Sequence, residues 1–171
     1  MRKVALRIVM VALAASAMRV SAAQLTLAAG WSDDARAVAR VGIAEDWQRR
    51  WWQTDSGHLR GYWHLAYSYW QGDVASSNHS LALTPVFVYQ FHGDGWAPFI
   101  EAGVGVALFS ETRMENNNLG SAFQFEDRLG IGIRWDDGRE LGMRVTHYSN
   151  AGLTMPNEGA ECFSLFYRWR F

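Results

Sequence analysis

The sequence predicts an all-β fold, an eight-stranded antiparallel up-and-down β-barrel that crosses a membrane and has a filled, polar interior. Apolar and polar residues alternate with a period of two, and turn-forming residues separate the alternating segments. The closing segment, residues 160–171, carries aromatic residues on one face and arginines on the other. This pattern suits a barrel in lipid, with apolar residues outward and polar residues inward. A soluble ligand-carrying barrel would show the reverse arrangement.

Eight segments carry this alternation: residues 24–32, 36–46, 59–70, 80–92, 96–109, 122–135, 139–148 and 160–171. Eight is the smallest strand number of outer-membrane barrels, and side chains can just fill the interior of such a barrel. We therefore expect a network of inward ion pairs and hydrogen bonds instead of a pore. The charged residues expected in this network near the last strands are Glu126, Arg134, Glu140, Arg144 and Arg168.

The connections between the segments alternate between short and long, which predicts an orientation. Gly93-Asp94-Gly95 and Asp136-Asp137-Gly138 are tight turns. The long, polar connections are residues 71–79, 110–121 and 149–159. Outer-membrane barrels place short turns in the periplasm and long loops outside. Residues 48–58 are a longer exception on the periplasmic side, and the pair Trp51-Trp52 suits the membrane interface. His58, His79 and His92 are expected in turns or loops, and His64 in the interior.

The N-terminus reads as a secretory signal, residues 1–23, followed by one barrel domain, residues 24–171. Arg2 and Lys3 precede an apolar run, and Ser21-Ala22-Ala23 supplies small residues for cleavage. The formal net charge of −1 gives no indication of a nucleic-acid partner. The single cysteine, Cys162, excludes an intramolecular disulfide and a cysteine zinc cluster, and packing is its expected role.

His147, Ser149 and Glu161 are three polar residues predicted on the apolar, lipid-facing side of the last two strands. The loop between these strands brings them together at the extracellular rim. Polar residues in lipid are costly without a purpose, and these types supply a nucleophile, a base and an orienting acid. They are equally compatible with interfacial residues bonded to headgroups. Residues 150–159 favour catalysis, because their Asn and Gly residues can aim amides at an oxyanion.

The sequence His147-Tyr148-Ser149-Asn150-Ala151-Gly152-Leu153, followed by Pro156-Asn157 and Glu161, resembles the PagL-type lipid A 3-O-deacylases of Gram-negative outer membranes. Segments earlier in the chain resemble the family as well: Trp51-Trp52-Gln53-Thr54, Gly61-Tyr62-Trp63, residues 85–89 and residues 98–103. The resemblance implies Ser149 as nucleophile, His147 as base and Glu161 as the acid that orients it. It also implies Asn150 as an oxyanion donor, with Gly152 as a weaker candidate for the second donor.

The resemblance implies an outer-membrane esterase that hydrolyses the 3-O-linked acyl chain of lipid A in lipopolysaccharide. The expected product is a 3-hydroxy fatty acid, the expected site faces the extracellular leaflet, and no cofactor or metal is expected. Two alternatives stay open: a phospholipase or acyltransferase barrel, and a non-enzymatic small barrel for adhesion or membrane integrity. The sequence also leaves open whether the chain forms a homodimer.

Overall fold

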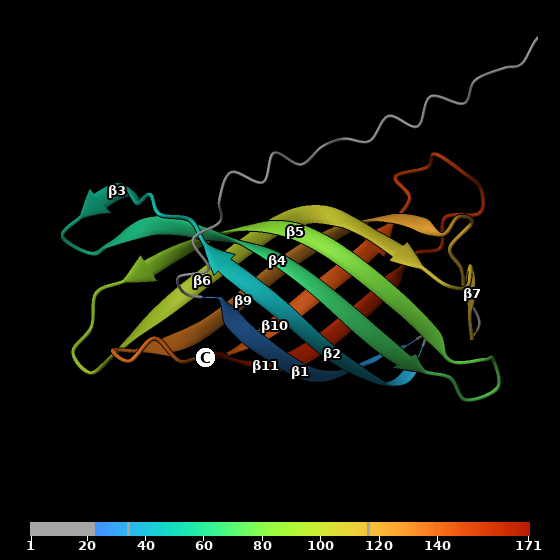
Figure 1. The fold of residues 1–171 in the computed structure, drawn as a ribbon. Coiled ribbons are helices and arrows are strands. Elements are labelled where there is room, and N and C mark those ends of the chain that lie inside the picture. Colours follow the sequence, from blue (N-terminus) through green and yellow to red (C-terminus); the bar gives the residue numbers. More distant parts are fainter. Residues whose placement is uncertain (1–22, 34, 116) are drawn as a thin grey trace, which may run out of the picture.

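The computed structural model describes residues 23–33, 35–115 and 117–171, so almost all of the expected signal segment lies outside the described residues. Within them the chain is all-β (Figure 1). No described helix is long and apolar enough to cross a bilayer. The strands are Gln24–Ser32 (β1), Ala35–Asp46 (β2), Trp51–Thr54 (β3), Gly57–Gln71 (β4), Asn78–Phe91 (β5), Trp96–Phe109 (β6), Arg113–Met114 (β7), Asn117–Asn118 (β8), Phe123–Trp135 (β9), Glu140–Ser149 (β10) and Ala160–Arg170 (β11).

The eight long strands close into one antiparallel barrel, which confirms the predicted fold class. The strand order is β2-β1-β11-β10-β9-β6-β5-β4, and pairing of β2 with β4 completes the ring. We call the end with residues 47–56, 92–95 and 136–139 the turn end. The opposite end, with residues 72–77, 110–122 and 150–159, is the loop end. Figure 1 shows the loops and β7 at one end of the barrel and β3 projecting from the other.

Two short hairpins add to the eight predicted strands. β3 pairs with the start of β4 at the turn end, and β7 pairs with β8 inside the loop that precedes β9. The expectation that His58 and His79 lie in loops is wrong, because β4 and β5 extend farther than the apolar alternation alone indicated. His58 pairs with Gln90, and His79 pairs with Tyr69. The His79 ring stacks on Tyr67 at the outer wall, with 5.8 Å between ring centroids.

Buried charge fills the barrel interior as predicted, and the inward glutamates organise it. Near the loop end, Glu126 accepts hydrogen bonds from Arg40 (2.8 Å) and Tyr148 (2.8 Å), and it pairs with Arg128. Arg128 also lies 3.1 Å from His64, which places that histidine in the interior network as expected. Such carboxylates are tolerated inside because each has cationic partners and further hydrogen bonds.

The other two buried glutamates occupy the middle and the turn end of the barrel. Glu140 pairs with Arg60 and Arg134, both at 2.7 Å, and with Arg168. Glu101 accepts from Arg144 at 2.6 Å and from the Tyr62 hydroxyl at 2.7 Å. Arg144 belongs to the inward network as expected, but its partner is Glu101 and not one of the nearby residues Glu126 and Glu140.

The reason is the strand register. Gly130 on β9 lies directly between Glu101 on β6 and Arg144 on β10. A Cβ at position 130 would come within 2.9 Å of Glu101 Cγ. Because glycine leaves this space open, the guanidinium reaches across β9 to the carboxylate.

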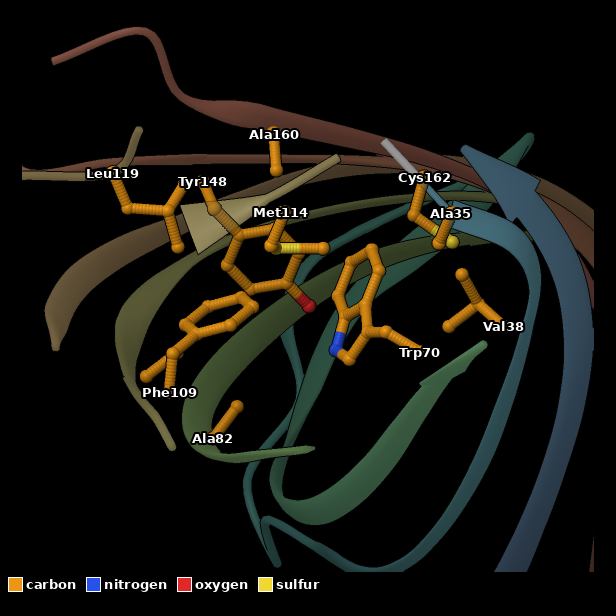
Figure 2. Packing of buried hydrophobic residues seen from close by; sticks show 11 residues of the cluster. Ala35, Val38, Trp70, Ala82, Phe109, Met114, Leu119, Tyr148, Ala160 and Cys162 are labelled. Atoms are coloured by element: carbon orange, nitrogen blue, oxygen red, sulfur yellow. The ribbon is translucent and has the colours of Figure 1, made fainter. Parts of the chain in front are cut away.

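An apolar cluster closes the interior at the loop end. Figure 2 shows the rings of Trp70, Phe109 and Tyr148 together, with Met114 and Leu119 from the loop above them. Tyr148 meets Phe109 at 5.2 Å and Trp70 at 5.5 Å, both edge to face, a favoured aromatic geometry. The end of β10 is therefore anchored by an inward side chain.

The loop before β9 also holds its neighbours in place. The Glu115 carboxylate accepts backbone hydrogen bonds from Asp73, Val74 (3.2 Å) and Ala75 (3.3 Å), which fastens residues 72–77. On the other side, Asn117 Nδ2 donates to Gly159 O at 3.2 Å. The β7–β8 hairpin thus lies between the two other long loops and is bonded to both.

Arg144→Ala should destabilise the barrel without affecting the chemistry of the outer wall. The substitution removes the arginine that pairs with the fully buried Glu101 and leaves this carboxylate only the hydrogen bond from the Tyr62 hydroxyl. An unpaired buried charge typically destabilises the folded state by ~3–5 kcal/mol. We expect a lower temperature of heat-induced unfolding on gels, with unchanged specific activity of the folded fraction. Arg139→Ala, which removes an exposed pair with Asp137, is the matched control and should change little. A stable but inactive Arg144→Ala protein would contradict the assignment.

Loop fastening by Glu115 should weaken in acid. The backbone N–H groups of Asp73, Val74 and Ala75 hold the pKa of Glu115 below its ordinary value. Because the pKa of Glu115 is lowered in the folded protein, its ionised carboxylate stabilises the loop above the ordinary pKa of glutamate. This stabilisation is lost as the pH falls through the lowered pKa of Glu115. Amide hydrogen exchange at residues 73–75 should lose protection as the pH falls below about 4.3, the ordinary pKa of a glutamate. Glu115→Gln should lack this pH dependence, and an equal loss in both proteins would refute the explanation.

Candidate active site

The alternation of inward and outward side chains at the end of β10 sets the orientation of the predicted catalytic residues. Tyr148 is fully buried inside, so its neighbours His147 and Ser149 point outward. On β11 the same parity applies, with Ala160 and Cys162 buried and Glu161 exposed. The two strands pair so that His147 lies directly opposite Glu161. The register therefore brings these residues together on the outer wall at the loop end.

His147 and Glu161 are in direct contact. His147 Nδ1 lies 3.4 Å from Glu161 Oε1, and the two side chains are 44% and 60% exposed. A carboxylate at Nδ1 fixes the ring orientation and leaves Nε2 for a nucleophile, as in the acid–base pair of serine hydrolases. This geometry can stabilise the imidazolium that forms when the ring takes a proton.

Ser149 lies on the same face as His147, two residues along β10. Its strand partner is Phe125 on β9, and it is half-buried. Among the residues that the structure describes, Ser149 Oγ makes no hydrogen bond. Catalytic hydrogen bonds are often long without substrate and tighten in the bound complex. The structure thus brings His147 together with Glu161, and Ser149 lies two residues farther along the same face of β10.

A second carboxylate flanks His147 on its other side. Asp127 on β9 is the strand partner of His147 and is exposed among outward apolar residues. Asp127 is not among the site residues predicted from the sequence. Its place beside the site follows from register, which the sequence does not specify.

Asn150 has a different place from the one expected of an oxyanion donor. Alternation turns its side chain inward, where it is fully buried. Its Nδ2 donates to Leu119 O and Thr154 O, both at 2.9 Å, and its backbone N–H donates to Asn157 Oδ1 at 2.9 Å. All its donors are therefore used to shape residues 150–157 and to bond this loop to the one before β9.

Gly152 lies at the exposed side of the same loop. Its φ is +76°, and Ala151 before it has φ +54°, so the chain turns sharply after β10. Within the described part of the chain the Gly152 N–H makes no hydrogen bond. A backbone N–H without a partner, three residues after Ser149, is free to donate a hydrogen bond to an oxyanion.

Gly159 completes the surroundings of the imidazole. Its φ is +74°, and a Cβ there would lie 3.3 Å from His147 Cε1 and 2.8 Å from Tyr148 O. The backbone therefore lies against the ring, and only glycine combines this conformation with this approach. Asn117 bonds the carbonyl of Gly159, so the β7–β8 hairpin supports this side of the site. From the sequence, this hairpin was expected only as part of the long, polar connection of residues 110–121.

Comparison with known proteins places the chain among enzymes. The family model for lipid A 3-O-deacylase (PagL) matches residues 33–170. The lipid A deacylase PagL of Pseudomonas aeruginosa is 50% identical over 148 residues, which are 86% of each chain. The lipid A deacylase PagL of Bordetella bronchiseptica is 35% identical over 108 residues, 63% of this chain and 60% of that protein.

Solved structures agree with this assignment. The crystal structure of the outer membrane enzyme PagL superimposes with a TM-score of 0.84 at 48% identity, covering 86% of this chain and 99% of that one. The N-terminal β-barrel domain of Pseudomonas aeruginosa OprF gives a TM-score of 0.52 at 13% identity, over 88% and 97% of the two chains, a likeness of fold alone. The chain therefore belongs to the PagL family of lipid A 3-O-deacylases, which makes it an outer-membrane β-barrel enzyme.

Proposed function

We propose that this protein removes the 3-O-linked acyl chain of lipid A by a Ser149–His147–Glu161 mechanism and releases a 3-hydroxy fatty acid. The observation that carries the proposal is the 3.4 Å contact of His147 Nδ1 with Glu161 on the outward face, with Ser149 beside it. An ester hydrolase for a membrane lipid needs its nucleophile on the wall that lipid touches. Family membership supplies the substrate, since the relatives are named lipid A deacylases.

In the first half of the reaction, His147 Nε2 takes the proton of Ser149 Oγ, which attacks the ester carbonyl carbon. Glu161 stabilises the resulting imidazolium through Nδ1. The tetrahedral intermediate then collapses, and His147 returns the proton to the departing 3-oxygen of the sugar. In the second half, His147 deprotonates a water molecule that attacks the acyl-serine ester, releasing the fatty acid and restoring the Ser149 hydroxyl.

Gly152 is the better candidate for the oxyanion donor. Its exposed N–H follows the nucleophile by three residues, whereas the donors of Asn150 are bonded within the loops. We assign Asn150 the role of a positioning residue that sets the conformation of this loop. Removing one oxyanion donor typically costs about 10²–10³ in kcat.

Orientation in the membrane follows from the loops. The three long connections are at the loop end, and outer-membrane barrels place such loops outside the cell. The site at that end would then meet the outer leaflet, where lipid A enters sideways from the bilayer. The outward residues on neighbouring strands below the site, Leu129, Val145 and Phe163, offer an apolar surface to acyl chains.

Mass spectrometry of lipid A from cells with and without the protein tests the substrate and the bond cleaved. We expect loss of one 3-hydroxyacyl group from the 3-position in cells that contain the protein. Phospholipid breakdown or acyl transfer in place of this loss would identify a different lipid enzyme. Unchanged lipids would identify a non-enzymatic barrel.

Ser149→Ala and His147→Ala should each abolish most turnover, because nucleophile and base act as a unit. Glu161→Ala should leave more residual activity, because this carboxylate only orients the ring and stabilises its charge. The measurement is the initial rate of 3-O-deacylation by folded protein in mixed micelles. Full activity in Ser149→Ala would refute the nucleophile.

Asp127→Ala is the matched control for Glu161→Ala. Both carboxylates are exposed strand partners of His147, but the contact with Nδ1 is made by Glu161. We therefore expect Asp127→Ala to retain clearly more activity than Glu161→Ala. The opposite order would assign the orienting acid to Asp127.

A further inference from the structure

A cavity at the turn end of the barrel has no place in the proposed reaction. Its volume is about 250 Å³, and its walls include Asp46, Trp47, Arg50, Arg60, Arg134 and Arg170. β10 begins beside it at Glu140 and ends at Ser149, and a strand of this length spans roughly 30 Å. The cavity is therefore remote from the outward catalytic residues.

Positive charge dominates the walls of this cavity. Four arginines line it against one carboxylate, Asp46. Glu140 lies behind the wall, but it divides its single charge among Arg60, Arg134 and Arg168. Asp46 Oδ2 already accepts from Gln24 at 2.7 Å and lies 3.4 Å from Arg170. The two carboxylates therefore leave cationic charge uncompensated around the cavity.

Hydrogen-bond donors also outnumber acceptors here. Arg60 is only 7% exposed. Among the described residues its Nε makes no hydrogen bond, and its Nη1 has only a 3.6 Å ion pair with Asp46 Oδ1. Trp47 Nε1 is buried and also makes no hydrogen bond to any residue that the structure describes. The Gln90 oxygen is used by Arg60 Nη2 at 3.3 Å. A ligand that only accepts hydrogen bonds and carries negative charge matches this surplus.

We propose that the turn-end cavity binds a phosphate group. Guanidinium groups bind phosphate through paired, charge-assisted hydrogen bonds. The volume is below the ~300–1,000 Å³ of pockets for drug-sized ligands, so it suits a small anion or a single headgroup. The proposal concerns a site separate from the deacylase chemistry and does not depend on it.

The phosphate has two sources, inorganic phosphate and the phosphodiester of a phospholipid headgroup. Trp47 connects the cavity with the outer wall, because its ring lies 6.0 Å from Trp63 and 5.0 Å from Phe87. Both partners are outward residues, 48% and 49% exposed. The cavity wall is therefore in contact with the outer wall at the turn end, so we consider a headgroup as well as free phosphate.

Thermal unfolding of the folded full-length chain in phosphate-free, lipid-free detergent tests the site. Sodium phosphate should raise the unfolding temperature in a saturable way, relative to sodium chloride of the same ionic strength. Arg50→Gln and Arg170→Gln should weaken the apparent affinity about tenfold or more, because each removes a charged hydrogen-bond donor. Arg49→Gln is the matched control, since Arg49 lies over the Trp51 ring and not in the cavity wall, and should keep the response. No saturable rise, or an equal rise in all four proteins, would overturn the proposal.

Repeating the titration in phospholipid nanodiscs separates the two sources. If a headgroup occupies the cavity, added phosphate should produce no further rise in wild-type nanodiscs while the detergent response persists. If free phosphate is the ligand, the rise should be the same in both environments. Calorimetric titration of phosphate into wild-type and Arg50→Gln protein at a fixed temperature, in the lipid-free detergent, measures the affinity without relying on unfolding. Equal affinities in that comparison would again overturn the site.

Discussion

Pairing of β1 with β11 is the constraint on which the rest of this structure depends. In lipid every backbone N–H and C=O needs a partner within the protein, so a sheet can cross only if its edge strands meet. Here the first and last strands pair from Gln24–Arg170 to Trp31–Phe163. Closure fixes the register around the ring, and register fixes which residues face inward. The positions of the buried glutamates and of the outward residues His147 and Glu161 are both consequences of that one arrangement.

The outward position of the site has a structural cost that the loops offset. His147, Ser149 and Glu161 lie on a surface that otherwise carries apolar side chains, and no surrounding core holds them. Tyr148 anchors the strand from inside, and Gly159 and the β7–β8 hairpin support it from the loop side. The contact of His147 with Glu161 on the outer wall is thus supported by packing on the inner face of the sheet and by hydrogen bonds from the loops.

Period-two alternation was sufficient to predict the eight long strands, their faces and the meeting of His147 with Glu161. What it could not predict depends on three-dimensional register. Arg144 pairs with Glu101 across Gly130, and this contact depends on the register of three strands, which the sequence pattern does not specify. The inward turn of Asn150 follows from alternation continuing one residue beyond the strand, where a loop was expected. The short strands β3, β7 and β8 were missed because pairs of two to four residues carry too little periodicity.

β10 shows how one strand serves stability and chemistry without conflict. Its even-numbered residues point inward, and among them Glu140, Arg144 and Tyr148 belong to the three buried charge clusters. Its odd-numbered residues point outward and end in His147 and Ser149. The backbone separates the two sets, so the inward charges lie across the barrel wall from the His147 imidazole. A buried ionic interior and the proposed active site can therefore share a strand, because the sheet itself lies between them.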